Sequence, residues 1–195
     1  MGTDATAMIT AVKVWIEQVV IDLNLCPFAA KVFFQDQVRY VVCGDADPEE
    51  ILTCIGVECQ RLLQTPVESI ATSLVLAPAL SDFEHYLDIL ALAEEFLERM
   101  EWGGIFQIAS FHPQYQFAEH DANDVSHYTN RSPVPIFHIL REEEVAKALA
   151  HYDLPESIPE RNIELMRKLG LETMRRKLQQ ASQILIDPSP DHANH

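Results

Sequence analysis

The sequence predicts a layered α/β protein built on a small, partly parallel sheet of three or four strands. A helix is expected before the sheet and a helical extension after it. Short β-branched runs alternate with longer segments of helical periodicity, which is typical of α/β layers. Three clear strands do not determine the strand order, so a ferredoxin-like α+β fold remains an alternative. We expect one globular domain over residues 1–186 and a flexible tail over residues 187–195.

The first half of the chain carries the clearest signals for individual elements. Apolar residues on one helical face predict a helix over residues 4–23, and Pro27 suits the first position of the next helix, with Cys26 as its N-cap. Asp47 followed by Pro48 is a strong helix start. The expected elements are strands at 38–43, 72–77 and 105–110 and helices at 47–64 and 82–97.

The segments after the third strand are harder to assign. Residues 134–140 fit either a fourth strand or the first turn of a helix that continues through residues 142–150. We favour the helix, because His138, Arg141 and Val145 would then share one face. A last helix is expected from residue 160 to about residue 185.

The charge balance excludes some kinds of partner. The chain has 30 acidic and 14 basic residues and a net charge of −16, which argues against binding to nucleic acid or to an anionic membrane. No run approaches the ~18 apolar residues of a membrane span, and the first residues lack the basic and apolar regions of a signal peptide. We therefore expect a cytoplasmic protein whose four cysteines are free thiols. The oligomeric state stays open.

The segment from Trp102 to Arg141 is where we expect the functional site. It contains four of the eight histidines and is long, polar, aromatic and poorly periodic, which is typical of a functional loop. His112 lies two residues past the third expected strand, where the ligand-binding groups of α/β domains gather.

A metal site is the first hypothesis for this segment. Its ligands would be His112, His120, Asp121 and His138, since imidazole and carboxylate groups bind zinc, iron or nickel. Their spacing matches no established ligand motif such as HExxH.

A thiol enzyme is the second hypothesis. Cys26 would be the nucleophile and His112 or His138 its base, because such partners meet in space rather than in sequence. The helix N-terminus expected at Cys26 would lower the pKa of its thiol.

An anion pocket is the third hypothesis and is compatible with the other two. Arginine carries a planar, permanent charge that suits a carboxylate or a phosphate, and polar and aromatic neighbours would complete the pocket. The expected binding residues are Arg39, Tyr115, Tyr128, Asn130, Arg131, Ser132, Arg141 and Arg161.

A purely structural role is the alternative to all three. The loop at residues 111–141 would then be a lid whose polar side chains pair backbone carbonyls, and the protein would be a non-catalytic accessory or protein-binding module. We favour a small-molecule-binding enzyme acting on an anionic metabolite, a carboxylate or phosphate, at a pocket of His, Arg and Cys residues. A divalent metal is a possible cofactor.

Four motifs stand out along the chain. They are NLCPF at 24–28, FQIASFHPQYQF at 106–117, YTNRSP at 128–133 with the PxxHxLRE run that ends at residue 142, and IPERN at 158–162. With these motifs the chain resembles an uncharacterised bacterial family, a domain of unknown function, over most of residues 10–170. The resemblance implies membership of that family and no particular reaction, cofactor or catalytic residue.

Overall fold

The sheet determines how the rest of the chain is arranged. In a computed structural model that describes residues 5–150, 152 and 154–187, four strands lie in the order β1-β2-β4-β3. They are β1 (Val38–Val42), β2 (Thr72–Leu76), β3 (Phe106–Phe111) and β4 (Ile136–Arg141). β1 pairs with β2 in parallel, whereas β4 lies antiparallel between β2 and β3. The predicted α/β class and partly parallel sheet are confirmed.

The ferredoxin-like alternative does not describe this sheet. A ferredoxin-like sheet is antiparallel throughout, but here β1, β2 and β3 run in one direction and only β4 is reversed. The β2-helix-β3-β4 part is a split βαβ unit, in which the last strand inserts between the two parallel ones. β1 and its helix extend that unit by one more parallel strand.

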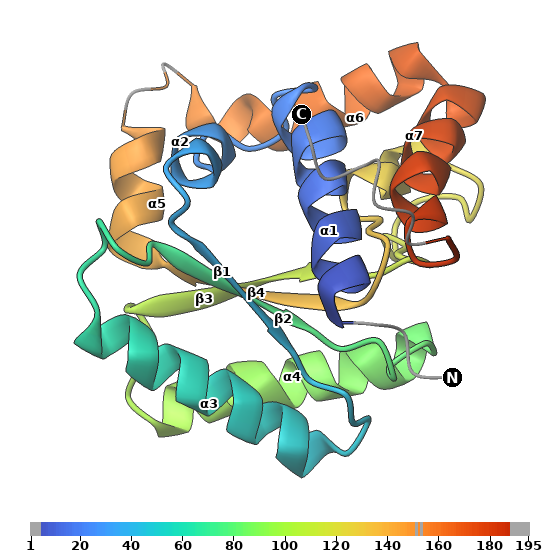
Figure 1. The fold of residues 1–195 in the computed structure, drawn as a ribbon. Coiled ribbons are helices and arrows are strands. Elements are labelled where there is room, and N and C mark those ends of the chain that lie inside the picture. The colour runs from blue at the N-terminus through green and yellow to red at the C-terminus, as the bar shows by residue number, and fades with distance from the viewer. Residues whose placement is uncertain (1–4, 151, 153, 188–195) are drawn as a thin grey trace.

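Two long helices cover one face of the sheet. They are α3 (Pro48–Gln64) and α4 (Phe83–Arg99), which lie side by side below the sheet in Figure 1. Asp47 caps α3 by accepting the backbone N–H of Glu49 at 2.8 Å, and Asp82 caps α4 by accepting that of His85 at 2.8 Å. Both helix predictions in this region are confirmed.

The opposite face is covered by helices from both ends of the sequence (Figure 1). These are α1 (Ala5–Trp15), a π-helical turn (Ile16–Ile21), α2 (Ala29–Phe34), α6 (Ile158–Leu169) and α7 (Leu171–Gln183), while α5 (Glu142–Leu149) follows β4 directly and two 3₁₀ turns lie at Val125–Thr129 and Pro155–Ser157. None of the helices in the described residues is long and apolar enough to cross a membrane.

Both faces of the sheet are therefore buried against apolar residues. One core contains Ile51, Ile55, Leu62, Val75, Tyr86, Phe137 and Ile139, and the other contains Val12, Trp15, Leu74, Ile136, Met166 and Met174. A strand covered on both faces reads as a continuous apolar run rather than as an alternating one. For this reason the helix favoured at residues 134–140 is wrong: Ile136–Arg141 is the internal strand β4.

Two more boundaries differ from the sequence prediction. The single helix expected from 160 to 185 is two helices, because Gly170 adopts φ 79°, outside the helical range, and ends α6. Cys26 is not a helix N-cap, since α2 begins only at Ala29 and Phe28 occupies the cap position. Residues 188–195 of the expected tail lie outside the described part of the chain.

A buried carboxylate joins α3 to the sheet. Glu58 is 2% exposed and accepts hydrogen bonds from Arg39 Nε at 2.8 Å and from the Ser73 hydroxyl at 2.8 Å, with Arg61 Nε at 3.4 Å. A carboxylate this deeply buried is stable only when its charge is compensated and its oxygens are hydrogen-bonded. Arg39 is therefore a structural partner of α3.

We predict that Arg39→Ala lowers the free energy of unfolding by about 3 kcal/mol, because it leaves the buried charge of Glu58 poorly compensated. Urea denaturation measures the change. The matched control is Arg99→Ala, which removes an exposed ion pair with Glu95 and should cost less than about 1 kcal/mol. Equal losses in the two variants would contradict a structural role for Arg39.

Candidate functional site

A cleft of about 520 Å³ lies between the turn that precedes α2, the loop that follows β3 and the start of α6. We call it the outer cleft. All four motifs contribute to its wall: NLCPF gives Leu25 and Cys26, FQIASFHPQYQF gives Phe111 and Phe117, YTNRSP gives Thr129 and Asn130, and IPERN gives Ile158, Pro159 and Asn162. Segments more than 130 residues apart in sequence thus meet at one place.

Side chains of α6 hold the NLCPF turn in position. Asn24 adopts φ 51°, a left-handed conformation that asparagine tolerates better than most residues, and this turns the chain after the π-helical segment. The side-chain amide of Asn162 donates to Leu25 O at 2.8 Å, and Arg161 donates to Asn24 O and to the side-chain oxygen of Asn162. Arg161, expected to bind an anion, thus joins two motif segments beside the cleft.

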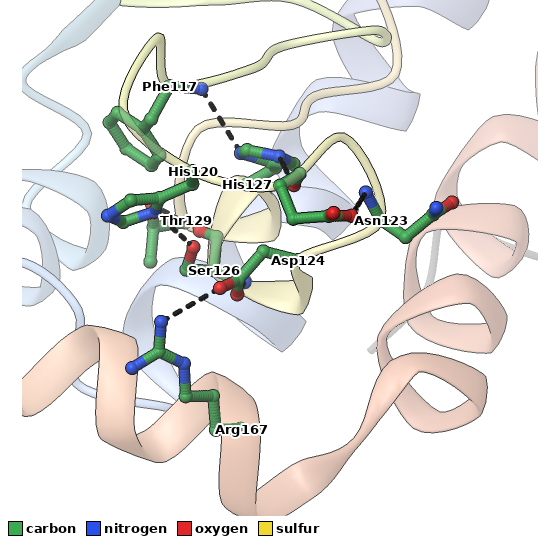
Figure 2. A network of polar contacts seen from close by, with 9 residues as sticks. Phe117, His120, Asn123, Asp124, Ser126, His127, Thr129 and Arg167 are labelled. Carbon is green, nitrogen blue, oxygen red and sulfur yellow. Dashed lines mark hydrogen bonds and ion pairs between the residues drawn. The ribbon is translucent and has the colours of Figure 1, made fainter.

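His127 stabilises the loop that forms another wall. Its Nδ1 accepts the backbone N–H of Phe117 at 3.1 Å, and its Nε2 lies 2.8 Å from the carbonyl oxygen of Asp121 (Figure 2). A carbonyl only accepts, so Nε2 carries the proton and the ring is neutral. Both nitrogens are occupied by the backbone, which leaves neither for a metal or for proton transfer.

His112 is held in the same way at the end of β3. Its Nδ1 accepts the N–H of Gln114 at 3.0 Å and its Nε2 donates to Leu80 O at 3.0 Å. The ring is fully buried and packs against both Phe83 and Tyr86, and this burial lowers the pKa of His112 because it disfavours the charged form. His112 lines neither the outer cleft nor the cavity described below.

His120 differs from these two histidines. Its Nδ1 lies 2.8 Å from the hydroxyl of buried Ser126, its ring packs on Phe117, and it lines the outer cleft. Among the described residues, Nε2 of His120 has no hydrogen-bond partner, and in Figure 2 this nitrogen is directed away from Ser126. His120 therefore presents a free ring nitrogen at the cleft.

An ion pair fastens the segment that carries Ser126 to α6. Asp124 accepts the N–H of Ser126 at 2.8 Å and pairs with Arg167 Nη2 at 2.8 Å (Figure 2). The Arg167 guanidinium, together with the Ser126 N–H, holds the pKa of the Asp124 carboxyl well below its usual range. The position of Ser126, and through it that of His120, thus depends on α6.

A second, smaller cavity of about 70 Å³ lies behind the outer cleft, between the π-helical segment, α2 and the sheet. We call it the inner cavity. Its wall is almost wholly apolar, and the lining side chains that carry a polar atom are Trp15, Cys26, Thr72 and His138. Val20, Cys26 and Phe111 line both spaces, so these three residues form the boundary between them.

His138 and Thr72 are hydrogen-bonded to one another inside the protein. The Thr72 hydroxyl donates its single proton to Ile139 O at 2.6 Å, so the 2.8 Å contact with His138 must be Nε2–H donating to Thr72 Oγ1. Burial lowers the pKa of His138 to about 4, because the protein interior disfavours the imidazolium. His138 is thus neutral at physiological pH.

The expected activation of Cys26 is wrong. Burial raises the pKa of its thiol, and the backbone N–H groups of Phe28 and Ala29 offset this only in part. A six-residue helix that begins three positions later does not provide the helix terminus on which the prediction relied. Cys26 and His138 both line the inner cavity, yet they rest there as a neutral thiol and a neutral imidazole rather than as an ion pair.

The predicted anion-binding arginines do not converge. Arg39 is bound to Glu58, and Arg141 donates to Thr65 O at 2.8 Å and Ile70 O at 3.1 Å. Arg131 donates to Tyr115 O at 3.1 Å and lies over the ring of Tyr128, 4.7 Å from its centroid. Each guanidinium therefore stabilises a separate part of the fold.

Two further residues of the predicted anion pocket lie in different places. Asn130 lines the outer cleft and donates to Ser110 O at 3.0 Å, whereas Ser132 is buried and donates to Val134 O at 2.6 Å.

Within the described residues, no three His, Cys, Asp or Glu side chains form a group that could hold a metal ion, so His112, His120, Asp121 and His138 are not brought together.

Several cleft residues escaped the sequence analysis. Most are apolar members of the motifs, and polar residues drew attention because they carry chemistry. The missed residues within the motifs are Leu25, Phe111, Ile158, Pro159 and Asn162. The signal that could have found them was the presence of all of them in the four motifs.

Fold and cleft together define an α/β protein with a split βαβ unit and a ligand-sized cleft at the junction of four motif segments. The chain belongs to the family described as "Protein of unknown function (DUF1415)", which matches residues 7–176. No curated protein matches the sequence, and no solved structure matches it.

We predict that His138 makes the stability depend on pH below neutrality. Its pKa is about 4 in the folded protein and ~6.5 in an unfolded chain, so the unfolded state binds more protons between these values. The contribution of neutral His138 to the free energy of unfolding is complete above pH ~6.5 and falls by roughly 3 kcal/mol towards pH ~4. Urea denaturation at several pH values measures this loss.

The variant His138→Gln keeps a hydrogen-bonding side chain that does not titrate, and its unfolding free energy should fall less steeply over the same range. His85→Gln, which replaces an exposed histidine of α4, is the control and should follow the unaltered protein. Identical pH dependence in His138→Gln and the unaltered protein would show that His138 is not the titrating group.

Proposed function

We propose that this protein is a small-molecule-binding enzyme, that its ligand occupies the outer cleft, and that His120 is the acid–base group. One observation carries the proposal: four motif segments meet at a single cleft in which one histidine keeps a ring nitrogen free. The other two histidines of the loop, His112 and His127, are fully buried and have both nitrogens bonded to backbone groups.

The size and lining of the outer cleft support a small ligand. Its volume of about 520 Å³ falls within the ~300–1,000 Å³ of small-molecule sites. Such sites combine mostly apolar walls with a few polar groups that orient the ligand. Here the polar groups are His120, Thr129, Asn130 and Asn162, with Glu119 and Cys26.

The contact between His120 and Ser126 suits proton transfer. A hydroxyl can accept from Nδ1–H or donate to a bare Nδ1, so Ser126 can hold the ring in either tautomer. When Nδ1 carries the proton, Nε2 is a base facing the cleft, and after it takes a proton the imidazolium keeps its bond to Ser126. Ser126 is thus a positioning residue and His120 the group that would touch the substrate.

The charge of the cleft bears on the kind of ligand. Its lining contains one carboxylate, Glu119, and neither lysine nor arginine among the described residues, while Arg161 lies beside it and donates to Asn24 and Asn162. We therefore propose a neutral or singly charged molecule, whereas the sequence predicted an anionic metabolite, either a carboxylate or a phosphate.

A non-catalytic accessory module is the second candidate. It is favoured by one observation, namely that His112, His127 and Arg131 all hold the loop by bonds to its backbone. A loop with a purely structural role needs these bonds and does not need a free nitrogen on His120.

A metabolite library tested by NMR chemical-shift perturbation separates the two candidates. We predict that some compounds shift the backbone amide signals of Thr129, Asn130 and Asn162. Their affinity should fall at least tenfold in His120→Ala, since the ligand loses a polar contact worth about 1.5 kcal/mol or more. His85→Ala is the control and should bind normally.

Two further results complete the test. Turnover of a bound compound should be lost in His120→Gln, because glutamine can neither take up nor release a proton in the reaction. Compounds that bind equally well to His120→Ala would refute the assignment of His120, and a library without any cleft-directed compound would favour the accessory module.

A further inference from the structure

The outer cleft and the inner cavity adjoin one another. Val20, Cys26 and Phe111 line both, so a molecule bound in the outer cleft lies against the same side chains that close the inner cavity. Each of these three residues is at least partly accessible. A ligand in the cleft therefore lies next to the inner cavity.

The inner cavity has the wall composition of an apolar binding site. Its side chains come from the π-helical segment and its neighbours, from α2 and from the sheet, and they include Trp15, Ile16, Phe28, Val32, Val38 and Leu74. No charged residue lines it within the described part of the chain. The hydrogen bonds of Thr72 to Ile139 O and of His138 to Thr72 use the proton donors of these two side chains, whereas the indole N–H of Trp15 is a buried donor without a partner among the described residues.

An apolar cavity of this kind costs stability when it stays empty. Unfilled core space forfeits dispersion contacts, and water gains little where it finds few polar partners. A volume of about 70 Å³ offers room for roughly five non-hydrogen atoms. A compact side chain could have filled it, as in the close-packed cores on both faces of the sheet.

We propose that the inner cavity receives a short, unbranched alkyl arm of the ligand whose polar part occupies the outer cleft. This inference rests on the proposed function and assigns its substrate class: an amphipathic small molecule with a polar head and an arm of about four or five carbons. The neutral Cys26 thiol at the boundary is a soft, apolar contact for the arm.

Linear 1-alkanols from ethanol to 1-heptanol are suitable probes, because they vary the length of the arm alone. Binding is followed by the NMR shifts of the Val32, Val38 and Leu74 methyl groups, which line the inner cavity, and of the Ile158 and Ile163 methyl groups, which line the outer cleft. Affinity should rise about fourfold for each added methylene and level off at about five carbons, when the cavity is full.

Two variants of α2 give a matched pair. Ala29 lines the inner cavity, so Ala29→Leu should fill it and abolish both the chain-length dependence and the inner methyl shifts. Ala30, the next residue of the same helix, lines neither space, and Ala30→Leu should retain both. Val38→Leu adds one methylene to the opposite wall of the cavity, so affinity should level off about one carbon earlier. This variant replaces Ala29→Leu in the test if Ala29→Leu does not fold.

The outcomes distinguish this inference from the function on which it rests. The proposal that an alkyl arm enters the inner cavity is overturned if affinity does not depend on chain length. It is also overturned if the same dependence on chain length persists in Ala29→Leu and Val38→Leu. If the alkanols shift the NMR signals of only the Ile158 and Ile163 methyl groups, binding of the arm in the inner cavity is refuted while binding in the outer cleft stands. Failure of the proposed function appears separately, as library compounds insensitive to His120→Ala.

Discussion

The need to pair backbone carbonyl groups in irregular segments governs much of this structure. The turn before α2 and the long loop after β3 lie against the protein body but form few regular backbone hydrogen bonds, so side chains bond to their carbonyls instead. Asn162 donates to Leu25 O, Arg131 to Tyr115 O, and His127 to Asp121 O. Without these bonds neither segment would keep the conformation that encloses the outer cleft.

The same requirement explains why polar residues in a loop were misleading guides to chemistry. A histidine such as His112 looks identical in sequence whether its nitrogens bind a metal or two backbone groups. Only the fold shows that Leu80 O and the N–H of Gln114 occupy both nitrogens, and these atoms come from different elements. The sequence predicted a site within residues 102–141, which form only part of the wall of the outer cleft, and it could not predict the role of each polar residue.

The regular elements were easier to predict because their signals are local. Asp47 and Asp82 mark helix starts through bonds to residues two or three positions ahead, and both helices begin where expected. β4 was missed because burial on both faces removes the alternation that identifies a strand. The break at Gly170 and the late start of α2 depend on backbone angles that composition indicates only weakly.

The bond between Asn162 and Leu25 has a consequence for the order of assembly during synthesis. Its two residues are 137 positions apart, so the NLCPF turn leaves the ribosome long before the α6 residues that hold it exist. Closing so long a loop costs conformational entropy that only late contacts repay. The sheet is complete at Arg141, ahead of α6, and the nascent chain therefore gains its hydrophobic framework before it gains an enclosed cleft.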